Sequence, residues 1–468
     1  MTVPLQVDPG AVTNAVNYAW VLTVTFLIFF MHAGFAMLEA GQVRSKNVAN
    51  QLTKNMLTWS VGVVVFFLAG TTVEGLVAMA TGGDPYVAFS ILDPASSLAW
   101  VDWLFGAVFA MTAATIVSGA VAGRMKLRAY VTYTVLLAAV IYPVVTGVTW
   151  AGGFLSALGF TDFAGGMIVH GMGGIAGLTA AWVLGPRIGR FNDDGTVNVI
   201  PGHSITFAVL GTLILAFGWY GFNVGTAAAP LADGATGLAD FGYVGRVALT
   251  TTLGMAAGAI GAGAISIVKN GKVDTLYVAN GMLAGLVSIT ANTDLITWYG
   301  ALAIGLLAGA QLPVVFEFVE KRLKIDDVCA VFPVHGSAGI MGALLVGVPV
   351  LTVPDAGVSL VSQAIGVGFI AAWTVVTTAL VFGALKAIGQ IRVSREHEIE
   401  GLDISEHGVE TYPEFSLGDE PAIADGGVRT DGGTDVGRPN DGEIKMVTAI
   451  IRPERLGDVK AALAEAGA

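Results

Sequence analysis

The chain has 468 residues, of which 54% are hydrophobic and 12% are charged, whereas an ordinary soluble domain is about 25% charged. A soluble protein cannot bury that much apolar surface while exposing so few charges, so the composition indicates a membrane protein. The single cysteine excludes a disulfide scaffold, a thiolate zinc site and a redox pair of cysteines.

The net charge of −12 is concentrated near the C-terminus. Residues 1–395 carry a net charge of −1, residues 396–443 carry −12 and residues 444–468 carry +1. None of these segments carries the large excess of Lys and Arg that would form a basic face, so we expect no nucleic-acid partner.

Hydropathy predicts an all-α polytopic protein of the cell membrane, because a helix that spans a bilayer needs about 20 predominantly apolar residues. The run at 275–291 is short, and the run at 296–320 contains Pro313. Together the runs define a membrane domain over residues 1–388. Eleven runs qualify: 12–38, 47–70, 101–123, 129–150, 165–185, 203–226, 241–269, 275–291, 296–320, 331–350 and 359–388.

The basic residues alternate between successive predicted loops. Lys and Arg follow each odd-numbered run, from the first to the eleventh. Because cytoplasmic loops collect Lys and Arg, this alternation predicts an N-terminus outside, a C-terminus inside and an odd number of spans. The intervening loops contain no Lys or Arg: 71–100, 151–164, 227–240, 292–295 and 351–358.

An internal repeat links the fifth run to the tenth. Residues 169–177 (VHGMGGIAG) match residues 334–342 (VHGSAGIMG), 165 positions later. Since the repeat spans five helices, the two halves are predicted to lie in the membrane with opposite orientations. The expected architecture is two inverted five-helix repeats plus an eleventh helix. In transporters of this plan, the substrate site lies at the repeat interface near the bilayer midplane.

His170 and His335 occupy matching positions of this repeat and are the strongest functional candidates. A lone buried histidine is more often structural, but ionisable residues within a membrane are usually functional. The pseudo-two-fold axis should bring the two imidazoles together. Desolvation and mutual repulsion then prevent both from being charged, so we expect them to share a hydrogen and titrate as a coupled pair.

Asp162 and Asp327 each lie eight residues before one of these histidines. A carboxylate at the start of a helix can accept hydrogen bonds from the free backbone amides, so a cap is the simpler interpretation. The alternative for Asp162 is attraction of cations to the outer side.

Aromatic residues cluster where three predicted helices reach the outer side. Such rings ordinarily mark a membrane interface. The alternative is a cation–π cage for a small cation, followed by a phenyl gate that removes its water. Ammonium fits this alternative, because aromatic faces hold the cation outside and histidine nitrogens handle it within. The cluster consists of Phe105, Phe109, Trp150, Trp219 and Phe222.

These motifs together resemble the ammonium transporter (Amt/Mep/Rh) family over about residues 12–415. The resemblance implies a homotrimer with one pore per subunit that conducts ammonium, ammonia or methylammonium for nitrogen uptake. It implies no enzymatic activity, cofactor or metal. The matching segments are 41–47 (GQVRSKN), 162–170 (DFAGGMIVH), 219–223 (WYGFN), 332–336 (FPVHG) and 400–408 (EGLDISEHG).

The resemblance also assigns roles to the aromatic cluster. It implies that Phe109 and Phe222 form the stacked phenyl gate. Trp150 corresponds to the outer cation–π wall, and Phe105 and Trp219 are expected near it.

Five polar residues receive roles in the same way. His170 and His335 are similar to the pore histidine pair of the family, and Asp162 is similar to its essential outer carboxylate. Thr290 resembles a pore threonine. Thr226 stands where many members have serine, which keeps the hydroxyl and adds a methyl group.

Three segments follow the membrane domain. Residues 389–414 resemble the cytoplasmic regulatory tail of the family, residues 415–442 have the composition of an acidic flexible linker, and residues 443–468 resemble the first strand and helix of the signal-transduction protein PII. A PII-type protein is thus an expected partner, fused or in trans. Apolar residues within the first segment predict that it docks: Ile391, Val393, Ile399, Leu402, Ile404 and Val409.

Two other functions stay open. One is an ammonium sensor that uses the same fold to signal through its cytoplasmic tail. The other is an intramembrane metal enzyme built on His170, His335 and a carboxylate. The second is weaker, because a catalytic zinc site uses three protein ligands and the sequence offers no third near the midplane.

Overall fold

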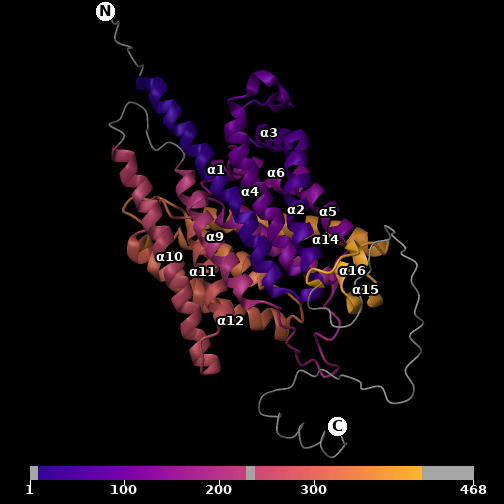
Figure 1. The fold of residues 1–468 in the computed structure, drawn as a ribbon. Helices are drawn as coiled ribbons and strands as arrows, with labels where there is room; N and C mark the ends of the chain where they lie inside the picture. The colour runs from indigo at the N-terminus through magenta and orange to yellow at the C-terminus, as the bar shows by residue number, and fades with distance from the viewer. Residues whose placement is uncertain (1–8, 228–237, 414–468) are drawn as a thin grey trace, which may run out of the picture. The chain divides into compact units, whose positions relative to one another are not determined.

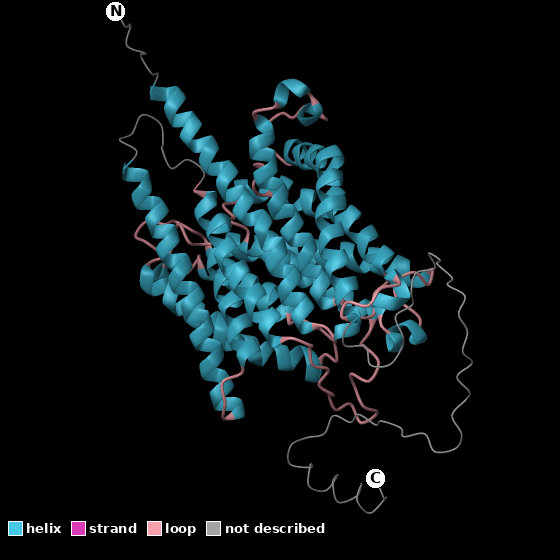
Figure 2. Ribbon diagram, in the orientation of Figure 1, coloured by secondary structure: helices cyan, strands magenta, loops and turns pink. Residues whose placement is uncertain are grey.

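The computed structural model describes residues 9–227 and 238–413. Within these ranges the chain is helical and forms no β-strand, only three isolated β-bridges (Figure 2). The linker predicted at 415–442 and the PII-like segment predicted at 443–468 lie outside the described residues.

Sixteen α-helices follow one another along the described residues (Figure 1). Their bounds are α1 Pro9–Gln42, α2 Val48–Val65, α3 Thr71–Ala80, α4 Ala99–Ala120, α5 Leu127–Leu136, α6 Tyr142–Val148, α7 Phe154–Ala157, α8 Met172–Leu184, α9 Ile205–Thr226, α10 Leu238–Asn270, α11 Thr275–Thr290, α12 Trp298–Glu317, α13 Ala338–Leu345, α14 Leu360–Ala387, α15 Arg395–Glu400 and α16 Leu402–His407.

Helices occupy all eleven segments that hydropathy predicts. Nine helices of the described residues are long and apolar enough to cross a membrane. The predicted runs 275–291 and 331–350 contain shorter apolar helices, Thr275–Thr290 and Phe332–Leu345. The all-helical multi-pass class is therefore confirmed, while the count of eleven spans and their orientation stay predictions.

The second span is longer than the sequence pattern indicates. It was expected over 47–70, with a loop from residue 71, but the helix continues from Ser45 to Ala80. The extension is helical because Glu, Leu, Ala and Met favour helix, and it ends just before Gly82, which has a φ of +107°. This extension adds a carboxylate, Glu74, to the helix.

Glycines allow α1 and α9 to pack at short range. A Cβ atom on Gly211 would lie 2.2 Å from the Leu38 backbone nitrogen, which no side chain tolerates. Helices α10 and α12 also pack closely at a glycine, since a Cβ atom on Gly309 would lie 1.9 Å from the Gly258 backbone oxygen. Small residues at such crossings are the usual means of close helix packing in membranes.

A buried charge network joins the loops that carry Lys and Arg. Asp326 is fully buried and lies 2.8 Å from the Arg187 guanidinium and 3.3 Å from that of Arg190. Burial alone would raise the pKa of Asp326, but the cations Arg124 and Arg187 outweigh it and hold this pKa well below its usual range. The loops are therefore fixed by a paired carboxylate that stays ionised.

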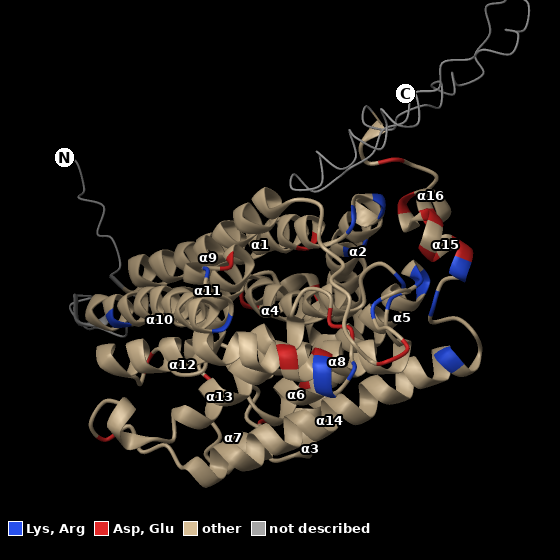
Figure 3. Ribbon diagram, turned by 90° about the horizontal axis from the view of Figure 1, so that it is seen from below, with Lys and Arg blue, Asp and Glu red and all other residues tan. Residues whose placement is uncertain are grey.

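The segment after α14 docks against the membrane helices. Helices α15 and α16 lie beside the Lys and Arg residues near α2 and α5 (Figure 3). The Asp403 carboxylate accepts a hydrogen bond from the Asn50 backbone amide at 2.9 Å, and the Glu406 carboxylate accepts one from the Leu127 amide at 2.9 Å. The tail thus caps helix starts that would otherwise leave amides unpaired.

The apolar tail residues behave in two ways. Ile391, Val393 and Leu402 are buried, which confirms docking for these three. The other three residues of the docked segment remain exposed in this chain. They are Ile399, Ile404 and Val409, at 54%, 38% and 46% exposure.

We predict that deleting residues 389–468 lowers the melting temperature of the detergent-solubilised protein, whereas deleting 415–468 leaves it unchanged. The longer deletion removes Asp403 and Glu406, which cap the starts of α2 and α5, and the loss of a helix cap costs about 0.5–2 kcal/mol. Scanning fluorimetry of the two truncations measures this. Hydrogen exchange of the full chain gives a second readout, with protection expected across 391–409. Equal melting temperatures would contradict the docking.

Candidate functional site

The two histidines lie on matching π-helical turns. These turns, Gly166–Gly171 and Phe332–Ser337, continue directly into α8 and α13. A Cβ atom on Gly174 would lie 2.0 Å from the Gly336 backbone nitrogen. Glycine at this crossing therefore lets the two copies of the repeat touch backbone to backbone, as the inverted-repeat prediction requires.

This contact brings the two imidazoles together. The Nδ1 atoms of His170 and His335 are 3.2 Å apart, and their rings are 16° from parallel. Both side chains are buried. Since one nitrogen must donate and the other accept, a single shared hydrogen links the rings at this distance. The predicted juxtaposition is confirmed.

Two phenylalanine rings lie next to the histidine pair. The rings of Phe109 and Phe222 lie 4.1 Å apart between centroids, and Phe222 lies 5.2 Å from the His170 ring. Both phenylalanines are buried. The phenyl pair therefore lies directly against the histidine pair.

A cavity of about 200 Å³ lies on the other side of the phenyl pair. Its wall includes Phe105, Phe109, Trp150 and Thr226. The Trp150 ring is perpendicular to that of Phe109, with centroids 5.8 Å apart. Aromatic faces and hydroxyl-bearing residues thus surround a space large enough for a small cation, and the structure brings these four predicted residues together.

Trp219 does not belong to this outer cavity. It is fully buried and stacks on His170, with ring centroids 4.6 Å apart. Its Nε1 donates a hydrogen bond to the Thr290 hydroxyl at 2.8 Å. The expectation that Trp219 lies near Trp150 was wrong, because residue 219 is about two helical turns from Thr226 along α9. Trp219 instead borders the histidine pair, and Thr290 is its hydrogen-bond partner.

Asp162 acts as a cap for the first π-helical turn. Its two carboxylate oxygens accept four backbone N–H bonds, at 2.7–2.9 Å, from residues 165–168. Asp327 accepts two such bonds, at 2.9 and 2.7 Å, at the matching turn. Burial raises the pKa of Asp162, while the amide donors favour its charged form. The cap interpretation is confirmed for both carboxylates.

The Asp162 loop also holds the Trp150 wall of the aromatic cavity in place. The Trp150 indole Nε1 donates a hydrogen bond to the Asp162 backbone oxygen at 2.8 Å. The orientation of the cavity wall therefore depends on the same loop that starts the histidine helix.

Two residues at the site escaped the sequence analysis. The ring of Phe35 on α1 lies 6.1 Å from the His335 ring, between centroids. Glu74 lines the outer cavity together with Trp150. The sequence did contain a signal, because Glu74 is a single carboxylate within an apolar stretch. That stretch was interpreted as a loop, so the signal was not used.

The donor set around the histidines does not resemble a metal site. Within residues 9–227 and 238–413, no group of three His, Cys, Asp or Glu side chains could hold a metal ion. The pair thus lacks the third protein ligand that a catalytic zinc site uses.

Comparisons with known proteins agree on one family. The Ammonium Transporter Family model matches residues 19–412. Ammonium transporter Amt2 of Haloferax mediterranei is 70% identical over 92% of this chain and 96% of that protein. Ammonium transporter Amt2 of Methanocaldococcus jannaschii is 42% identical over 86% of this chain and 93% of that protein.

Solved structures share the fold. One described as a sensor Amt protein has a TM-score of 0.76 at 31% identity and covers 85% of this chain and 100% of that chain. Saccharomyces cerevisiae Mep2 has a TM-score of 0.69 at 23% identity and covers 81% of this chain and 89% of that chain.

We predict that Asp162→Asn lowers the melting temperature, because the amide group would turn a donor toward backbone N–H groups. Each buried donor left without an acceptor costs about 1–3 kcal/mol. Asp93→Asn, a change at an exposed cap, is the control and should have a much smaller effect. A stable Asp162→Asn protein with a lower affinity for cations would instead assign the residue to cation attraction.

Proposed function

The chain belongs to the ammonium transporter family, whose members are transporters and not enzymes, and from this premise we propose that it conducts ammonia derived from ammonium across the cell membrane. One observation carries the proposal. A histidine pair with Nδ1 atoms 3.2 Å apart lies directly behind a closed phenyl pair, within a glycine-packed repeat interface.

Recognition begins in the outer cavity. Trp150 and Phe105 supply aromatic faces that attract an ammonium ion, and the residue Thr226 provides an oxygen in the same wall. Cation–π attraction contributes about 0.5–2 kcal/mol, with the larger value when the cation has lost its water. Methylammonium satisfies the same chemistry.

The phenyl pair then excludes hydrated ions. Rings whose centroids are 4.1 Å apart leave no space for a water shell between them. Passage requires a ring movement and a dehydrated permeant, which favours deprotonation of ammonium before the gate. Neutral ammonia loses far less hydration energy than the cation in such an apolar passage.

The histidines next provide hydrogen-bond partners for the permeant. His170 and His335 share one hydrogen, so the pair offers both a donor and an acceptor to ammonia without carrying a full charge. Trp219 stacks on His170 and holds its ring plane. This arrangement supports passage of ammonia rather than of a cation.

A sensor function is the second candidate, and the docked tail favours it. Asp403 of the tail binds Asn50 of α2. Helix α2 also contacts Glu39 of α1, whose carboxylate accepts a hydrogen bond from Gln51 at 2.7 Å. Since Phe35 of α1 lies against the histidine pair, a continuous set of contacts joins pore and tail. Ammonium flux into liposomes that contain the purified protein separates the two functions.

Assembly and regulation form the remaining part of the proposal. We infer a homotrimer with one pore per subunit, residues 389–414 as its regulatory tail, and control by a PII-type protein. The acidic linker at 415–442 would tether the PII-like residues 443–468 to that tail.

We predict that His170→Ala or His335→Ala changes the ratio of electrical current to ammonium flux more than it changes thermal stability. Loss of one imidazole removes the shared hydrogen and leaves space for water, so that charge can pass with the permeant. Solid-supported membrane currents and flux on the same liposomes measure the ratio. Wild-type flux and current in both variants would contradict the proposed role.

We predict that Trp150→Leu raises the half-saturation concentration for ammonium and weakens selection against other monovalent cations. The lost cation–π contribution of about 1–2 kcal/mol corresponds to roughly a 5- to 30-fold effect. Trp182→Leu, a change at an exposed tryptophan outside the cavity, is the matched control. Unchanged affinity and selectivity would make Trp150 a structural wall only.

A further inference from the structure

We propose that Glu74 is a second recognition residue for ammonium, which passes the cation from an acidic outer cavity into the aromatic one. This inference rests on the proposed function and adds to it a charged residue and an entry route. The argument starts from the two cavities that Glu74 separates.

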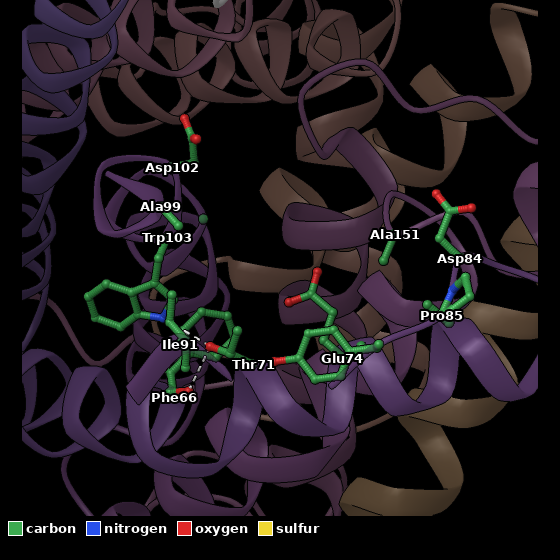
Figure 4. Close-up of a pocket in the computed structure, with 14 residues that line it drawn as sticks. Phe66, Thr71, Glu74, Asp84, Pro85, Ile91, Ala99, Asp102, Trp103 and Ala151 are labelled. Carbon is green, nitrogen blue, oxygen red and sulfur yellow. Dashed lines mark hydrogen bonds between the residues drawn. The ribbon is translucent and has the colours of Figure 1, made fainter. Parts of the chain in front are cut away.

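Glu74 belongs to the walls of both cavities. The aromatic cavity of about 200 Å³ and a larger one of about 390 Å³ share Phe66, Glu74 and Gly106 in their linings. The larger cavity lies beside α3 and α4, and the Glu74 carboxylate points into it (Figure 4). A cation in the larger cavity therefore meets this carboxylate on its way to Trp150.

The larger cavity has an unbalanced negative charge. Asp84 and Asp102 contribute two further carboxylates to its wall, and neither cavity is lined by a Lys or an Arg. Among the ion pairs of the described residues, none involves Glu74. A cleft lined by one sign of charge concentrates the opposite ion and speeds its entry.

The wall also offers groups suited to a cation that carries N–H donors. The Tyr86 hydroxyl is buried and has no hydrogen-bond partner within the described residues. The Trp103 ring lines the same space. Carboxylate and hydroxyl oxygens accept N–H bonds, and a hydrogen bond to a charged acceptor is about twice as strong as a neutral one. Ammonium, with four N–H groups, fits this lining better than an alkali cation of similar size.

The side chain of Glu74 is partly exposed to solvent. It lies on the helical extension of the second span, and its side chain is half-buried. A fully dry carboxylate would be neutral, and a fully exposed one would be screened by salt. When it is ionised, a partly buried carboxylate attracts a nearby cation more strongly than it would in open water.

Gly106 marks the passage between the cavities. It lines both of them, and a Cβ atom placed on it would meet no other atom within 4 Å. A larger side chain at this position would thus fill the passage without displacing the helix backbone. This gives a second test that leaves the carboxylate in place.

The experiment measures methylammonium and ammonium uptake into liposomes at low and high salt. Glu74→Gln is expected to raise the half-saturation concentration about tenfold, with the maximal rate kept within about twofold, and to reduce the salt dependence of uptake. Glu74→Asp should restore most of the affinity. Asp355→Asn, which removes the same charge from an exposed position outside both cavities, should behave as wild type.

Gly106→Leu should also raise the half-saturation concentration, and by more than the smaller Gly106→Ala. Wild-type affinity and salt dependence in Glu74→Gln would overturn the role of Glu74, even if the protein transports. Should Glu74→Gln fail to fold, wild-type affinity in Gly106→Leu would overturn the entry route. Absence of uptake by the wild-type protein would instead overturn the proposed function.

Discussion

The contact between two buried imidazoles is the constraint on which the rest of this structure depends. Two rings with nitrogens 3.2 Å apart in a dry interior are stable only while they share a hydrogen and remain uncharged as a pair. To reach this distance, the two repeats must approach backbone to backbone, and the crossing of Gly174 and Gly336 allows it. Larger residues anywhere at this crossing would separate the rings.

The π-helical turns that carry the histidines need support, because irregular backbone in a membrane is tolerated only when its polar groups find partners within the protein. Asp162 supplies four acceptor bonds to one turn, and Asp327 supplies two to the other. The same residue that starts the helix also fixes Trp150 through its backbone oxygen. The turn that carries His170 and the Trp150 wall of the aromatic cavity are therefore parts of one local structure.

The sequence predicted the features that recur with a fixed period or spacing. It did not predict the positions of residues that depend on how deep they lie in the fold or on whether a helix continues. The hydropathy runs, the matched histidines and the capping carboxylates all follow patterns with a fixed period or spacing. Trp219 was misplaced because proximity along the chain to Phe222 does not reveal depth along a helix. Glu74 was missed because its polar neighbours Thr71 and Thr72 resemble a loop start, although the helix continues through them. The exposure of Ile399 could not be predicted, because an apolar residue in a docked segment can face either the protein or the solvent.

The distribution of charge bears on the proposed transport of neutral ammonia. With the predicted orientation, the outer end has the carboxylates Glu74, Asp84 and Asp102 without a basic residue in either cavity wall. In the loops that carry Lys and Arg, Arg187 and Arg190 are paired with the buried Asp326, which balances much of their charge. On the proposed function, a cation would be drawn to the acidic cavity and would then meet an uncharged histidine pair behind the phenyl rings. Such a pair suits ammonia, which needs no counter-charge once its proton has been left in the cavity.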